Sequence, residues 1–161
     1  MTRQIPLAQA EAVATELVKA LAPYFERLEV GGSIRRRRPM VHDIDLVGIP
    51  QVTTWWELGG KIVEIADRVE RQGDKLTTFI FKGIQVDLYY ASRETWSTLV
   101  LIRTGSKENN IRLCMLARDR GWQLKANGDG LFDEHGNRVA GDTEESIYEA
   151  LGLPFQEPWE R

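Results

Sequence analysis

The segment that most constrains this 161-residue chain is an apolar stretch that carries two carboxylates, Asp43-Ile44-Asp45-Leu46-Val47. Branched aliphatic residues favour a β-strand, and side chains two residues apart on a strand lie on the same face. We therefore expect Asp43 and Asp45 on one face, about 7 Å apart along the strand. Two carboxylates at that separation repel each other unless a cation lies between them. The pattern predicts a strand with a cation-binding face.

A third carboxylate supports this interpretation. Asp87 interrupts another apolar run, from Ile84 to Leu88, on a strand that we expect to lie alongside the first. An Asp-x-Asp pair alone more often marks a strand end or a turn than a metal site. The third carboxylate and the preceding Gly-Ser turn favour the metal site. Such a set suits two Mg²⁺ ions, with Mn²⁺ as a substitute, and paired ions serve in-line phosphoryl displacement.

The turn before the first strand has the composition of a phosphate-binding loop. The backbone N–H groups of Gly32 and Ser33, with the Ser33 hydroxyl, can hold phosphate oxygens. Arg36 can pair with a triphosphate through two parallel hydrogen bonds. The four arginines at 35–38 alone would more often be a solvated loop, but beside a phosphate site we assign Arg36 to function. The sequence has no Walker A motif.

Composition narrows the class of protein. Apolar residues make up 42% of the chain, enough for an ordinary core. Cys114 is the only cysteine, which excludes a disulfide scaffold and indicates a reducing compartment. There is no long apolar run and no signal peptide, so we expect a cytoplasmic protein without membrane contact. The net charge of −3 argues against strong non-specific coating of nucleic acid, but not against a basic groove.

Hydrophobic periodicity predicts two α/β units. The first should contain helices over 6–24 and 57–70 and strands near 28–30, 43–47, 75–82 and 84–90. The second should begin near Ser92, with helices over 94–103 and 106–121, short strands near 122–125, 130–133 and 138–140, and a last helix from Thr143.

These motifs occur in the order found in one enzyme family. They are the segments 32–36, 43–45, 86–88, 104–110, 130–132 and 143–152. Together they resemble the family X DNA polymerases, the DNA polymerase β-like nucleotidyltransferases, over essentially the whole chain. The Asp-x-Asp motif is shared by many nucleotidyltransferases, whereas Thr104-Gly105-Ser106 with Asn110 and the C-terminal block are much more specific.

The resemblance implies the fold class and the domains. We expect an α+β protein, in which a nucleotidyltransferase fold (a mixed β-sheet packed with helices) is followed by a small α+β C-terminal subdomain. Residues 1–91 would form the palm, and residues 92–161 would close over nucleotide and template. Lyase, helix-hairpin-helix and phosphoesterase modules of larger members are not expected. This minimal form should therefore bind DNA weakly, distributively and with strong salt dependence.

The resemblance also assigns roles to residues. Asp43 and Asp45 would ligate both metal ions, and Asp87 would ligate the catalytic ion and activate the primer 3′-hydroxyl. The expected nucleotide-binding residues are Gly32, Ser33, Arg36, His42, Ile102, Arg103, Gly105 and Asn110. The expected DNA-binding residues are Lys107, Arg112, Cys114 and Arg118.

Four residues, at three sites, depart from the family pattern. Ile102-Arg103 replaces an aromatic pair that helps to exclude the ribose 2′-hydroxyl, so we expect ribonucleotides to be accepted more readily. Cys114 replaces an arginine that contacts the template minor groove, which predicts low fidelity. His42 stands where some members have glycine, and it either contacts phosphate or simply fits.

The implied function is a repair-type, DNA-directed DNA polymerase that fills gaps distributively. Its partners would be dNTPs and primer–template or gapped DNA, and its state a monomer. One alternative is a template-independent nucleotidyltransferase, or one that acts on RNA, a protein hydroxyl or a small molecule. The C-terminal block disfavours that alternative. Another is an inactive DNA-end-binding module, which the presence of the three aspartates disfavours.

Overall fold

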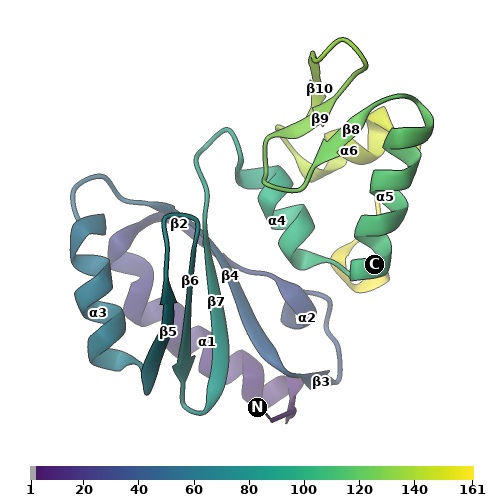
Figure 1. Cartoon of the computed structure of the whole chain (residues 1–161). Helices are drawn as coiled ribbons and strands as arrows, with labels where there is room; N and C mark the ends of the chain where they lie inside the picture. The colour runs from purple at the N-terminus through teal and green to yellow at the C-terminus, as the bar shows by residue number, and fades with distance from the viewer. Residues whose placement is uncertain (1–2) are drawn as a thin grey trace.

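The first unit of the chain is built on a five-stranded mixed β-sheet, as the computed structural model of residues 3–161 shows (Figure 1). Its strands lie in the order β2-β4-β7-β6-β5, in which β4 and β7 are parallel and the other neighbouring pairs are antiparallel. The strands are β2 (Phe25–Val30), β4 (Asp43–Pro50), β5 (Arg68–Gln72), β6 (Leu76–Phe81) and β7 (Ile84–Tyr90).

One face of this sheet is covered by two helices. Helix α1 (Leu7–Leu21) follows Pro6, whose fixed φ suits a helix start, and it buries apolar residues that recur at helical spacing. Helix α3 (Leu58–Ile65) flanks the sheet (Figure 1). Ile44 and Leu46 of β4 belong to the same buried cluster as side chains of both helices. The shorter elements of this unit are β1 (Ile5–Pro6), η1 (Ala22–Tyr24), α2 (Gly32–Arg35), β3 (Met40–Val41) and η2 (Trp55–Glu57).

The opposite face of the sheet is covered only in part. Val47 and Ile49, near the end of β4, pack against Trp96 and Leu99 of helix α4 (Trp96–Thr104). The beginning of β4, which carries Asp43 and Asp45, instead borders two cavities. The alternation of side chains along one strand thus separates a core face from a face available for chemistry.

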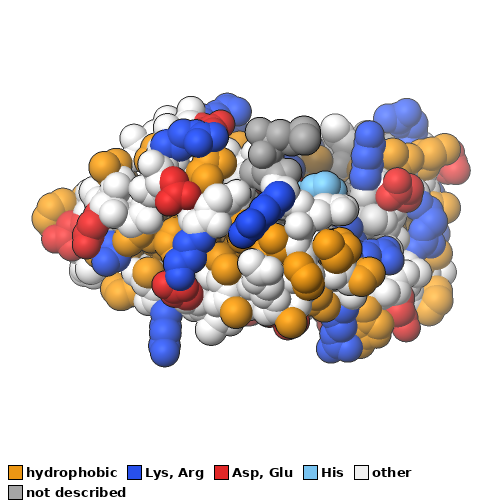
Figure 2. Space-filling model, turned by 90° about the horizontal axis from the view of Figure 1, so that it is seen from below, with side chains coloured by type: hydrophobic (Ala, Val, Ile, Leu, Met, Phe, Trp, Pro, Cys, Tyr) orange, Lys and Arg blue, Asp and Glu red, His pale blue; other side chains and the backbone are white. Residues whose placement is uncertain are grey.

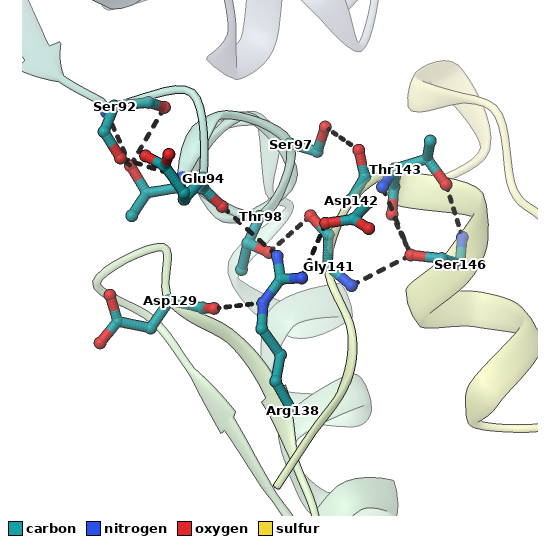
Figure 3. Close-up of polar contacts among 11 residues, drawn as sticks. Ser92, Glu94, Ser97, Thr98, Asp129, Arg138, Gly141, Asp142, Thr143 and Ser146 are labelled. Atoms are coloured by element: carbon teal, nitrogen blue, oxygen red, sulfur yellow. Dashed lines mark hydrogen bonds and ion pairs between the residues drawn. The ribbon is translucent and has the colours of Figure 1, made fainter.

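The second unit has its own core beside α4. It contains α5 (Lys107–Asp119), the antiparallel sheet β10-β9-β8, α6 (Glu144–Ala150) and η3 (Pro158–Glu160). The strands are β8 (Gln123–Lys125), β9 (Gly130–Phe132) and β10 (Arg138–Ala140). Arg138 fastens these parts, donating to Asp142 Oδ1 at 2.7 Å, to the Asp129 carbonyl at 2.9 Å and to the Glu94 carbonyl at 3.3 Å (Figure 3).

An ionic cluster joins the two units. Glu144 of α6 accepts hydrogen bonds from Arg35 of α2 at 2.7 and 2.8 Å and from Arg161 at 2.8 Å. Arg37 stacks on the Trp159 ring at 3.8 Å, and Arg38 donates to the Arg161 carbonyl at 3.0 Å. The run of arginines at 35–38 is therefore not a solvated loop, because all four contact the C-terminal unit.

The α+β fold class is confirmed, and most of the expected elements form. The helix expected over 57–70 is wrong in its second half, since α3 ends at Ile65 and the edge strand β5 follows. Strand β5 contains a single apolar residue, Val69, and it is held in the sheet by backbone hydrogen bonds to β6. The division of the chain at residue 91 remains a prediction. No helix among residues 3–161 is long and apolar enough to cross a bilayer.

Candidate active site

Three aspartates meet on the open face of the sheet. The parallel register of β4 and β7 places Asp45 directly beside Asp87 and Asp43 beside Gln85. Neighbouring strands lie about 4.8 Å apart, so residues paired across a ladder share a face and lie close together. The register brings together the three carboxylates that the sequence pattern predicted for the site.

The Asp87 carboxylate is held by two polar neighbours. Thr78 of β6 stands opposite Asp87 and donates its hydroxyl to Oδ1 at 2.8 Å. The Gln85 amide lies 3.3 and 3.4 Å from the two carboxylate oxygens. These contacts fix the orientation of Asp87. Sequence reasoning missed Thr78, because only the pairing of β6 with β7 reveals the contact.

Asp45 lies in an environment that disfavours its charge. Burial, followed by the carboxylates of Asp87 and Asp43, raises the pKa of Asp45 from 3.8 to about 7. The guanidinium groups of Arg103 and Arg36 oppose this rise without cancelling it. The cationic side chains of the protein therefore do not fully compensate the negative charge on this face.

The donor set fits a divalent cation that arrives together with a phosphate ligand. Carboxylate oxygens are the ligands that Mg²⁺ prefers, and its protein sites usually combine one or two carboxylates with substrate phosphates. No three His, Cys, Asp or Glu side chains in residues 3–161 are grouped closely enough to hold a metal ion by themselves. The raised pKa of Asp45 is what we expect of carboxylates whose counter-charge is supplied by a ligand.

The phosphate-binding loop predicted at 32–36 packs directly against Asp45. Gly32 has φ +58°, and a Cβ atom there would lie 2.1 Å from Asp45 Oδ2, so only glycine fits. The N–H of Gly31 donates to the Asp45 carbonyl at 2.8 Å. Loop and carboxylate are thereby held side by side, as an anion site next to a cation site requires.

Arg36 reaches from this loop to the second unit. Its Nη1 donates to the Thr104 carbonyl at 2.6 Å, and a Cβ on Gly105 would lie 3.0 Å from the same nitrogen. Burial, and then the charge of Arg38, lower the pKa of the Arg36 guanidinium. Its Nε is buried and has no hydrogen-bond partner among the described residues.

A cavity of about 640 Å³ lies between the loop, the sheet and α5. Ten predicted site residues line it: Gly32, Arg36, Asp45, Ile102, Arg103, Gly105, Lys107, Asn110, Cys114 and Arg118. Tyr89, Thr104, Ile111 and Met115 also line it and were missed. Tyr89 follows Asp87 by two residues, a spacing that places both on one strand face and could have revealed it.

A second cavity, of about 490 Å³, shares Arg36 and Asp45 with the first. It brings in the predicted residues Ser33, Asp43 and His42, and the His42 ring hydrogen-bonds Gln4 at 2.8 Å. Because Arg36 and Asp45 border both cavities, the two spaces adjoin at these two side chains. Asp87, the third predicted carboxylate, lines neither cavity and joins the site through its pairing with Asp45.

Orphaned polar atoms in the larger cavity indicate a polar ligand. Arg103 Nε and Asn110 Oδ1 are buried without a hydrogen-bond partner in the described part of the chain. The Arg103 guanidinium stacks on the Tyr89 ring at 4.0 Å, and Asn110 Nδ2 donates to the Ile102 carbonyl at 2.8 Å. Buried polar groups are normally satisfied, so we expect a bound molecule to supply the missing partners.

Helix α5 presents a mixed surface to the same cavity. Ser106 caps the helix by accepting the Asn109 N–H. Ile111 and Met115, four residues apart, are exposed at 49% and 56%. Burial raises the pKa of the Cys114 thiol, which argues against a nucleophilic role. Arg112, predicted to bind DNA, lies outside the cavity and bonds Asn109 Oδ1 at 3.0 Å.

Comparisons with known proteins agree with this geometry. Residues 99–161 match the family model "DNA polymerase beta thumb". The chain is 25% identical over 162 residues to the "DNA polymerase/3'-5' exonuclease PolX" of Bacillus subtilis (strain 168). That alignment covers 96% of the chain and 28% of the relative, so the chain spans little more than a quarter of that protein's length.

A solved structure shares the fold. The polymerase beta of Leishmania infantum, in a ternary gap complex, superposes with a TM-score of 0.81 at 20% identity. The superposition covers 99% of this chain and 71% of that one. At this level of identity the likeness concerns the arrangement of both units, and the chemistry must be argued from the residues themselves.

Proposed function

We propose that the chain is a DNA-directed DNA polymerase, a function supported by its similarity to family X and polymerase beta proteins. It adds dNTPs to the 3′-hydroxyl of a DNA strand, fills gaps of the kind that arise in repair, and acts distributively as a monomer. The observation that carries the proposal is the Asp45–Asp87 pair, in which Asp45 packs against a phosphate-type loop and lines the adjoining cavity.

The proposed reaction assigns a task to each group. The loop N–H groups of Gly32 and Ser33 and the Arg36 guanidinium bind and orient the triphosphate. Asp87, fixed by Thr78, orients the primer 3′-hydroxyl and receives its proton. The new bond forms between that oxygen and the α-phosphorus, and pyrophosphate leaves. Positioning and charge neutralisation supply most of the rate enhancement in this chemistry.

Asp43, Asp45 and Asp87 would hold two Mg²⁺ ions together with the triphosphate oxygens, and Mn²⁺ would substitute. Bound in this way, the ions supply Lewis acidity and neutralise charge on the attacking and leaving oxygens. The charge balance of the site supports this assignment, since burial and the neighbouring carboxylates raise the pKa of Asp45 to about 7.

Selectivity would depend on residues on the cavity wall. Arg103 stacks on Tyr89, leaving a guanidinium where an aromatic gate against the 2′-hydroxyl would stand. Cys114 and Ile111 line the same space, and neither side chain carries a charge that could contact the edge of a template base. We therefore propose weak discrimination of the sugar and low fidelity in base selection.

Primer extension on duplex DNA with a one-nucleotide gap tests the proposal. Each dNTP is supplied separately with Mg²⁺ or Mn²⁺, at low salt. Incorporation of the complementary nucleotide alone, lost in Asp45→Asn, supports a template-directed polymerase. Incorporation regardless of the template base would instead identify a terminal transferase. Absence of incorporation with either ion would contradict a DNA acceptor.

A further inference from the structure

Strand β5 places one unpaired cation on the edge of the catalytic face. The ladder pairs Asp45 with Asp87, Asp87 with Thr78 and Thr78 with Arg71, so the four side chains form one row across the sheet. Arg71 stands two strands from Asp87, or about 10 Å at 4.8 Å per strand. No strand pairs with the outer side of β5, so Arg71 stands on the edge strand of the sheet (Figure 1).

A β-bulge sets the identity of this residue. Val69 pairs with Phe79, so a regular ladder would place Glu70 opposite Thr78. The register shifts by one between Val69 and Arg71, and Arg71 takes that place instead. Bulges commonly re-aim a side chain beside a functional site. Here the shift places the positive Arg71, instead of the negative Glu70, at the end of a row that contains two carboxylates.

The neighbouring charges leave Arg71 available. Arg68 Nε lies 3.0 Å from Glu70 Oε1, so these two side chains neutralise each other. Arg71 is exposed and has no ion pair or hydrogen bond from its side chain within residues 3–161. On the lower side of the molecule, basic side chains are dispersed among hydrophobic ones instead of gathered in one patch (Figure 2).

We propose that Arg71 binds a backbone phosphate of the acceptor strand, within the last few nucleotides before its 3′ end. This inference rests on the proposed function, because it takes the 3′-hydroxyl to lie at Asp87. A polynucleotide that ends there and runs along the row toward the edge strand passes over the catalytic face of β5. A guanidinium donates two parallel hydrogen bonds to phosphate, which suits it to this contact.

Binding measurements with a catalytically inactive variant test the contact between Arg71 and the primer phosphate separately from catalysis. In an Asp45→Asn background, Arg71→Gln should weaken the binding of fluorescent primer–template about tenfold at low salt. The slope of log K against log salt should become about one smaller, as expected for one lost phosphate contact. Arg68→Gln, on the same strand but paired with Glu70, is the matched control and should change neither quantity.

A neutral methylphosphonate at single primer linkages identifies the phosphate. In the Asp45→Asn protein that retains Arg71, a methylphosphonate at one of the last few primer linkages should weaken DNA binding. Combining that linkage with Arg71→Gln should cause no further loss, because both changes remove the same contact. Additive losses at every linkage, or equal effects of the Arg68 and Arg71 variants, would overturn the assignment. If the wild-type protein extends DNA while the binding results exclude Arg71, the Arg71 contact is refuted and the polymerase proposal is not.

Discussion

Replacing Asp45 with asparagine is expected to stabilise the metal-free protein while abolishing nucleotidyl transfer. The pKa of Asp45 is raised from 3.8 to about 7 by burial and by the carboxylates of Asp87 and Asp43. At about 1.4 kcal/mol for each pKa unit, ionised Asp45 destabilises the folded state by about 4 kcal/mol. Asparagine keeps the shape that packs against Gly32 and removes this charge.

The stabilisation should depend on pH in a defined direction. Between about pH 4 and pH 7, folded Asp45 keeps its proton while the unfolded chain has lost it, so folding takes up a proton. The wild-type protein therefore becomes less stable than Asp45→Asn as pH rises from about 4 to about 7. Above pH 7 the difference in stability between the two proteins stays constant. We expect the difference in the free energy of unfolding between Asp45→Asn and wild type to be about 4 kcal/mol at pH 8 and about 2 kcal/mol at pH 5.

Urea unfolding in the presence of EDTA, at pH 5 and pH 8, measures this difference in the free energy of unfolding. Asp74→Asn, at an exposed position in the turn between β5 and β6, serves as the control and should leave stability nearly unchanged at both values. An Asp45→Asn protein no more stable than wild type at pH 8 would refute the reasoning. A gap of the same size at both pH values would refute it as well.

Further predictions concern selectivity and positioning. Arg103→Phe should increase the preference for dNTPs over rNTPs in steady-state kcat/KM, and an unchanged ratio would exclude Arg103 from sugar selection. Cys114→Arg should lower misinsertion opposite each template base, whereas equal error rates would exclude that position from fidelity. Thr78→Val should lower kcat about tenfold with little change in KM for dNTP, because it frees the Asp87 carboxylate. Thr78→Ser should restore most of the rate, and a Val variant with full kcat would dismiss the contact.

Local patterns in the sequence were sufficient to predict the carboxylate strands. The two-residue period of β4 and the apolar run around Asp87 predicted both strands and the face that their aspartates share. Ser106 and Thr143 cap their helices as their side chains suggest. Such signals are local, since each depends on residues a few positions apart.

Features that depend on pairing between distant segments could not be predicted in this way. Strand β5 carries one apolar residue and is held by its backbone ladder to β6, so its pattern resembled the end of a helix. The support that Thr78 gives Asp87 follows from the β6–β7 register. The bond of Arg35 to Glu144 spans 109 positions, and it changes the interpretation of the whole arginine run.

Labelling of competing acceptors tests the central claim most directly. An α-labelled dNTP with Mg²⁺ is offered a gapped DNA, the same DNA with a 3′-dideoxy end, an RNA primer and the protein alone, with wild type and with Asp87→Asn. We predict label on the DNA that ends in a 3′-hydroxyl, little on the RNA, none on the other acceptors, and none with Asp87→Asn. Label on the blocked DNA or on the protein, or full transfer by Asp87→Asn, would contradict the assignment of this site to DNA 3′-end extension.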